Sequence, residues 1–271
     1  MRHFLLQSAL LCAAFCGFAQ SSTDTLHSRK GRFYLLWGYN RDWYARSNIH
    51  FKNNGDPGEL NNFGVYDFTL YHLRAHDRPD FDKLGDVINF TIPQYNFRIG
   101  YALNEWSGFE LNYDHAKYIV DDGQVAHIKG SIFGQQMDKD TLLDQPYFHF
   151  EHSDGANFWM ISYVRKRKLV VNGCKKCDLS LFVKSGMGPV IPRTDVTIFS
   201  NRINNRFHVA GMCAGLEGGL HAEFFKHLTL EFSGKGVVAD YMDCLVQGHG
   251  HGQASHFLEA FEAVLVAGYT F

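Results

Sequence analysis

The feature that most constrains this sequence is a strict alternation of apolar and polar residues. The C-terminal run is the clearest, with apolar side chains at every second position: Phe261, Ala263, Leu265, Ala267, Tyr269 and Phe271. A β-strand places successive side chains on opposite faces, whereas a helix repeats every 3.6 residues and would mix the two sets. The pattern therefore predicts long β-strands with one apolar face.

Seven further stretches alternate in the same way. They are residues 33–44, 95–101, 109–114, 157–165, 179–188, 210–222 and 228–235. Strands of about ten residues have the length needed to cross a bilayer at a tilt. An even number of strands is usual for bacterial single-chain barrels. We therefore predict an all-β fold, an eight-stranded antiparallel transmembrane β-barrel.

The connections between these stretches differ in length. Two are short, at 104–107 and 226–227, and a basic one of medium length covers 166–177. The other four are long: 45–91, 121–156, 190–208 and 241–256. With the N-terminus in the periplasm, the short turns are periplasmic and the long loops extracellular, as in outer-membrane barrels. The cell outer membrane is the predicted location.

Hydropathy and charge exclude other classes. The mean hydropathy is −0.22, and no run of 18 apolar residues follows the N-terminal segment, which excludes a helical membrane protein. The net charge of −2 provides no basic field for nucleic acid. Arg2 followed by the apolar run 4–18 predicts a signal peptide at 1–19, and 20–271 would form the single barrel domain.

Two cysteines with two residues between them, Cys174 and Cys177, lie in the polar segment between two alternating stretches. In an oxidising compartment this spacing indicates a local disulfide across a turn. A redox centre is the alternative, but no thioredoxin-like βαβ pattern surrounds the pair. We predict the disulfide.

Charged residues occupy the polar face of several predicted strands. The predicted lumen network comprises Arg98, Glu110, Lys184, Glu217, Glu231, Lys235 and Glu262. Eight strands enclose a space that side chains can fill, and buried charges are tolerated when they are paired. We expect Arg98–Glu110 and Lys235–Glu231 or Lys235–Glu262 contacts. The network either rigidifies the barrel or provides an ion path.

The first long loop is rich in polar side chains. Its candidate ligand-binding residues are Asp67, His72, His76, Asp77 and Arg78. Alternation from Tyr66 to His76 indicates an extra hairpin or strand extension above the membrane. Long ordered loops commonly have a function, so this cluster either binds a surface ligand or forms a compact plug.

The last long loop contains closely spaced histidines. His249, His251 and His256 are candidate ligands for zinc, nickel or copper, because glycines between imidazoles let the backbone adapt to an ion. A solvated His-Gly loop without metal is the alternative. We expect no organic cofactor.

A third polar set combines the groups of an activated nucleophile: Asp114, His115, His152, Ser153 and Asp154. It resembles the outer-membrane lipid A deacylases, eight-stranded barrels with a histidine–serine motif and a separate acidic residue. That family has one residue between His and Ser, whereas His152 and Ser153 are adjacent and would point to opposite faces of a regular strand.

The whole chain after residue 19 resembles small outer-membrane barrels of the OmpA/OmpX-like and lipid A deacylase-like kind. The segments that carry this resemblance are 92–101, 114–118, 150–155 and the closing strand ending in Phe271. It implies contact with the barrel assembly machinery, outer-membrane lipids and lipopolysaccharide. We expect a non-enzymatic structural or ligand-binding barrel with an unknown surface ligand. The alternative is a lipid A-modifying hydrolase.

Overall fold

The computed structural model describes residues 31–55, 64–78, 94–152, 154–169, 177–246 and 252–271. Within these ranges the regular structure is β-strand, in one 17-stranded sheet. The strands are β1 (Arg32–Tyr44), β2 (Ser47–Asn53), β3 (Tyr66–Leu73), β4 (Ala75–His76), β5 (Tyr95–Ala102), β6 (Ser107–His115), β7 (Tyr118–Val120), β8 (Gln124–Ile132), β9 (Gln135–Leu143), β10 (Phe148–His152), β11 (Phe158–Leu169), β12 (Cys177–Val190), β13 (Asp195–Ile198), β14 (Asn201–Asn204), β15 (Gly211–Phe224), β16 (Leu228–Leu245) and β17 (Gly252–Thr270).

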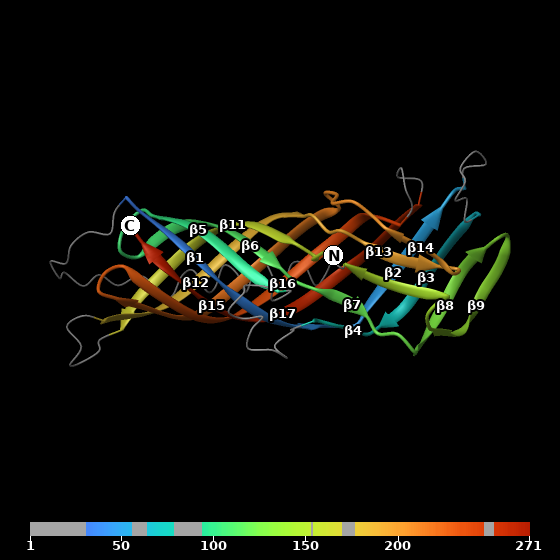
Figure 1. The fold of residues 1–271 in the computed structure, drawn as a ribbon, viewed down its shortest axis with the longest axis horizontal. Helices are drawn as coiled ribbons and strands as arrows, with labels where there is room; N and C mark the ends of the chain where they lie inside the picture. The colour runs from blue at the N-terminus through green and yellow to red at the C-terminus, as the bar shows by residue number, and fades with distance from the viewer. Residues whose placement is uncertain (1–30, 56–63, 79–93, 153, 170–176, 247–251) are drawn as a thin grey trace, which may run out of the picture.

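The long strands close into a barrel (Figure 1). Antiparallel pairing runs from β1 through β5, β6, β11, β12, β15 and β16 to β17, and β17 pairs again with β1. Within the described residues this ring has eight members. Closure leaves none of them with an unpaired edge over the shared height of the ring. The predicted all-β antiparallel barrel is confirmed.

The two faces of the ring differ in chemistry. Ile161 on β11 and Leu265 on β17 point outward and are 67% and 50% exposed. Arg98 on β5 and Glu262 on β17 point inward and are fully buried. Large apolar side chains exposed all around a barrel are stable in hydrocarbon and would aggregate in water. The outer face of the ring is therefore a membrane-spanning surface.

In the described part of the chain, no helix has the length and hydropathy needed to cross a membrane.

The short turns and the C-terminus lie at one end of the barrel (Figure 1). In the turn between β5 and β6, the Asn104 side chain accepts hydrogen bonds from the backbone N–H groups of Trp106 and Ser107, at 2.8 and 2.9 Å. In the turn between β15 and β16, Phe225 and Lys226 adopt positive φ angles of 55° and 67°. Such tight turns join adjacent antiparallel strands without a longer loop.

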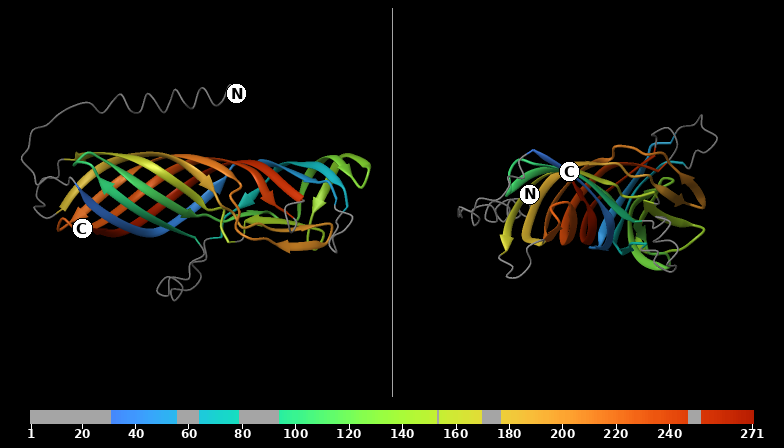
Figure 2. Two further views of the ribbon diagram at one scale, coloured as in Figure 1. Left: turned by 90° about the horizontal axis from the view of Figure 1, so that it is seen from above. Right: turned by 60° about the vertical axis from the view of Figure 1, so that its left-hand side comes forward.

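At the other end, much of the predicted loop sequence forms strands. The end of β17 continues into pairing with β2, and the order then runs β3, β8 and β9 (Figure 2). A second group adds β4, β7, β10, β13 and β14. The sequence predicts long loops at 45–91, 121–156, 190–208 and 241–256, with an extra hairpin or strand extension from Tyr66 to His76. Strands β3 and β4 cover that segment, whereas β2, β8–β10, β13 and β14 were not predicted. Their alternating runs are short, so the sequence pattern is weak there.

The extracellular extension, defined here as β2–β4, β7–β10, β13–β14 and the outer ends of β16 and β17, has an apolar interior. Phe51 stacks on Phe68 at 5.3 Å and meets Phe150 edge-on at 5.6 Å between ring centroids. Burial of each Phe side chain stabilises the folded state by roughly 1.5–3 kcal/mol. Charged side chains are thus buried inside the membrane-spanning ring. Aromatic side chains are buried inside the extracellular extension, whose outer surface faces water.

Candidate functional site

The centre of the barrel holds a continuous charge network. Arg98 donates two hydrogen bonds to the Glu217 carboxylate at 2.7 and 2.9 Å, and lies 3.4 Å from Glu110. Lys184 bridges Glu110 and Glu231 at 2.9 and 2.7 Å. These five charged side chains come from β5, β6, β12, β15 and β16, so they connect non-neighbouring strands across the lumen.

Lys235 extends the network toward the extracellular extension. Its ammonium donates to the Asp114 carboxylate and lies 3.7 Å from Glu262. The structure thus places the seven predicted lumen residues in the interior, and the Arg98–Glu110 and Lys235–Glu262 pairs are among its contacts. Glu231 instead pairs with Lys184, at 2.7 Å. Bulk water has little space among side chains packed this way.

The predicted catalytic set is dispersed. Asp114 faces the lumen and accepts hydrogen bonds from Asn96 and Lys235. His115, the next residue, points to the other face of β6 and lies 2.8 Å from the Asn157 side-chain oxygen. Neighbouring residues of a strand point to opposite faces, so this separation follows from the strand itself.

The remaining members of that set have other partners. Asp154 forms an ion pair with Arg193, and the His152 ring lies in the extracellular extension beside His256. Ser153 lies outside the described residues. Among the described residues no hydrogen bond joins His152 to Asp114 or Asp154, so the lipid A hydrolase stays a prediction.

Two of the predicted ligand-binding residues lie on β3. Asp67 contacts the His50 ring nitrogen at 2.7 Å and Lys52 at 3.7 Å. His72 has a φ of 58°, and its backbone N–H donates to the Asn48 side chain at 2.8 Å. Their polar partners are thus supplied by β2.

The other three predicted ligand-binding residues follow β3 in sequence but have separate partners. His76 contacts Asp121 at 2.7 Å. Asp77 is buried, and its carboxylate accepts the backbone N–H of Asp42 at 2.8 Å. The Arg78 guanidinium lies 3.5 Å from Glu151. Asp77 thus connects this segment to the outer end of β1, whereas His76 and Arg78 pair with residues of the extension, and the three side chains do not converge on one pocket.

Several sequence predictions fall partly on residues outside the described ranges. Cys174 lies there, so the Cys174–Cys177 disulfide stays a prediction. His249 and His251 also lie there, and so does the signal peptide at 1–19. The third histidine of the metal prediction, His256, is on β17 and is buried.

Sequence reasoning missed a buried cluster of His152, Cys244 and His256. Their potential ligand atoms all lie within 4.8 Å of one another, and the two Nε2 atoms are 3.2 Å apart. Burial, together with the nearby His256 ring, holds the pKa of His152 well below its usual range, so this imidazole is neutral. No local motif could have identified the cluster, because its members are brought together only by the pairing of distant strands.

An apolar pocket of about 270 Å³ lies among β3, β8, β9 and β10 in the extracellular extension. Its wall is mostly aliphatic and aromatic, and includes Phe68, Ile128, Met137, Phe148 and Phe199. Residues of β9 form one side of it: Gln135, Met137, Lys139, Thr141, Leu142 and Leu143. Because polar residues alternate with apolar ones only weakly in β9, the sequence pattern did not indicate an apolar face there.

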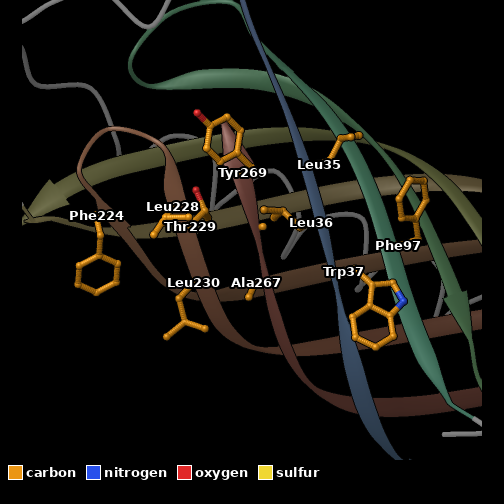
Figure 3. A pocket seen from close by; sticks show the side chains of 11 residues that line it. Leu35, Leu36, Trp37, Phe97, Phe224, Leu228, Thr229, Leu230, Ala267 and Tyr269 are labelled. Carbon is orange, nitrogen blue, oxygen red and sulfur yellow. The ribbon is translucent and has the colours of Figure 1, made fainter. Parts of the chain in front are cut away.

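A second hollow lies on the outside of the ring (Figure 3). Leu35 and Trp37 of β1, Phe97 of β5, and Leu230 and Tyr269 of β16 and β17 line it. It is wide open and belongs to the membrane-spanning surface, where lipid acyl chains would fill it.

A scan against protein-family models and a search of curated proteins both find no match. Among solved structures the chain is similar to Ail, the attachment invasion locus protein of Yersinia pestis, with 10% identity, 89% of this chain and 99% of that chain covered, and a TM-score of 0.34. It is also similar to OprG from Pseudomonas aeruginosa, with 10% identity, coverage of 89% and 96%, and a TM-score of 0.41. The outer-membrane protease OmpT from Escherichia coli gives 10% identity, coverage of 92% and 99%, and a TM-score of 0.30.

The strand pairing and the chemistry of the two faces carry the classification by themselves. A closed antiparallel ring, an exposed apolar outer surface and a paired charged interior together describe a barrel that crosses a membrane. Short turns at one end and a large folded extension at the other complete the arrangement. The chain therefore has the fold of a small outer-membrane β-barrel protein, and the cell outer membrane is its location.

Proposed function

We propose that this protein is a non-enzymatic, ligand-binding barrel whose binding region is the extracellular extension and not the lumen. The apolar pocket among β3, β8, β9 and β10 is the observation that carries this proposal. Pockets that bind small molecules are concave and mostly apolar, with a few polar groups that orient the ligand. This pocket has that composition.

The ion pairs of the lumen also favour ligand binding in the extension over passage of a solute through the ring. Arg98, Lys184 and Lys235 each contact two or more carboxylates, and all three are buried. Moving a solute through this space would separate ion pairs in a region of low dielectric, which is costly. The ring therefore acts as a rigid support for the extension.

The lining of the pocket indicates the chemical class of the ligand. Aromatic and aliphatic side chains form most of the wall, while Gln135, Lys139 and Thr141 of β9 contribute polar groups. A small amphiphile with an apolar tail and an anionic group fits this combination, because the ammonium of Lys139 can attract the anion while the tail is buried.

The experiment uses the full protein in lipid nanodiscs with a photoactivatable medium-chain fatty acid. After illumination, we expect labelled peptides from residues 131–148. Met137→Arg places a charge inside the pocket and should reduce this labelling at least tenfold. Gln136→Arg is the matched control, since Gln136 is exposed on the opposite face of β9 and does not line the pocket.

Labelling of the barrel's lipid-facing strands serves as the internal reference and should be equal in all three proteins. Equal labelling of residues 131–148 in wild type and Met137→Arg would contradict the proposal. A change in the lipid A mass spectrum of cells that express the protein would instead support the hydrolase.

A further inference from the structure

Three strands bring two imidazoles and a thiol together inside the extracellular extension. His152 is the last residue of β10, Cys244 lies near the end of β16, and His256 lies near the start of β17. His152 and Cys244 are fully buried and His256 is 4% exposed. The potential ligand atoms of all three lie within 4.8 Å of one another.

The spacing of the two imidazoles is that of a metal site. Their Nε2 atoms are 3.2 Å apart. Two nitrogens bound to one tetrahedral zinc ion, each at about 2.0–2.1 Å, are separated by about 3.3 Å.

Neighbouring side chains hold the rings in this orientation. Tyr241 stacks on His256 with centroids 4.7 Å apart and an interplanar angle of 5°, and on His152 at 4.9 Å. Tyr118 stacks on His256 at 5.3 Å. The Thr194 hydroxyl lies 3.3 Å from Nδ1 of His152, where it can accept a hydrogen bond from Nδ1–H in the tautomer that leaves Nε2 free as a ligand. Such outer contacts fix the tautomer and direction of metal-binding histidines.

We propose that His152, Cys244 and His256 bind one zinc ion through the two Nε2 atoms and the Cys244 sulfur. The thiol proton is released to solvent when the Zn–S bond forms, and the fourth position is open to water. A donor set of two nitrogens and one sulfur favours zinc or copper over calcium and magnesium. His256 thus keeps the metal-binding role predicted from the sequence, with partners on β10 and β16.

Binding would tie β10, β16 and β17 together, and the metal's binding energy would then stabilise the folded extension. This inference is independent of the proposed amphiphile pocket, since none of the three residues lines it.

The test begins with the full protein refolded in detergent without metal and titrated with Co²⁺. We expect saturation at one equivalent, with an intense near-ultraviolet thiolate-to-cobalt band that Zn²⁺ abolishes. Cys244→Ser should remove the band, and His256→Gln should weaken Co²⁺ binding at least tenfold. Zn²⁺ should raise the melting temperature of wild type and not that of Cys244→Ser.

Two controls localise the site. Cys213→Ser removes another buried cysteine, one whose sulfur faces the backbone oxygens of Gly188 and Pro189, and should keep the band. The double variant His249→Ala/His251→Ala should also keep it. Loss of the band in that double variant, or its survival in Cys244→Ser, would overturn the proposal.

If Cys244→Ser does not fold, X-ray absorption of the zinc-loaded wild type decides. One sulfur and two imidazole nitrogens around the ion are expected. A zinc environment without sulfur, or wild-type protein that binds no Co²⁺, would overturn the assignment.

Discussion

At the scale of single residues, the buried charges of the lumen are tolerated because they are paired. Arg98 is enclosed by Glu217 and Glu110, and Glu217 also accepts a hydrogen bond from the Ser233 hydroxyl at 2.6 Å. Arg98→Met would leave two buried carboxylates short of a cation. We expect this variant to lose about 3–5 kcal/mol of folding free energy. The urea dependence of folding into lipid vesicles measures this loss.

The double variant Arg98→Met/Glu217→Gln tests the reason for that loss. Removing the negative charge together with its partner should restore part of the stability, since an unpaired buried carboxylate is the main cost. Equal instability of the single and double variants would show that packing of the Arg98 side chain, and not its charge, is the dominant contribution.

At the scale of elements, the contact of β1 with β5 depends on a glycine. Gly100 faces inward, and a Cβ built there would overlap the ring of Tyr34, whose hydroxyl donates to Glu110 at 2.9 Å. Gly100→Ala should displace this ring and cost about 1–3 kcal/mol. Gly236→Ala on β16 is the control, because a Cβ there meets nothing within 4 Å. Semi-native gel mobility during heating would compare them, and equal transition temperatures would contradict the expectation.

Elements also show what the sequence can predict. The ring strands are long, and their alternation is sustained, as in β17, so both their existence and their inward faces follow from periodicity. Strands such as β7 and β13 have three and four residues, all buried, and so carry no alternation. Their conformation is set by pairing with distant partners, which a single sequence does not reveal. The His152–Cys244–His256 cluster was missed for the same reason.

At the scale of the whole molecule, an arginine in place of an exposed apolar residue has different consequences within and above the membrane. Leu265 on β17 and Val125 on β8 are both exposed, at 50% and 67%. Leu265 lies on the ring, between Phe261 and Tyr269 on the same outer face, whereas Val125 lies on the extracellular extension and does not line the apolar pocket. We expect Leu265→Arg to destabilise the protein by about 2–4 kcal/mol, the cost of a charge facing the bilayer centre.

Val125→Arg, at a position that faces water, should change the folding free energy by less than about 0.5 kcal/mol, as ordinary surface substitutions do. Folding titrations into vesicles give both values, and the same titrations in vesicles of shorter-chain lipid add a direct physical check. A thinner hydrocarbon layer should reduce the Leu265→Arg penalty and leave Val125→Arg unchanged, since an arginine side chain reaches the interface more easily across a shorter distance. A penalty at Leu265 that does not depend on lipid thickness would mean that this face of the ring does not contact the bilayer core.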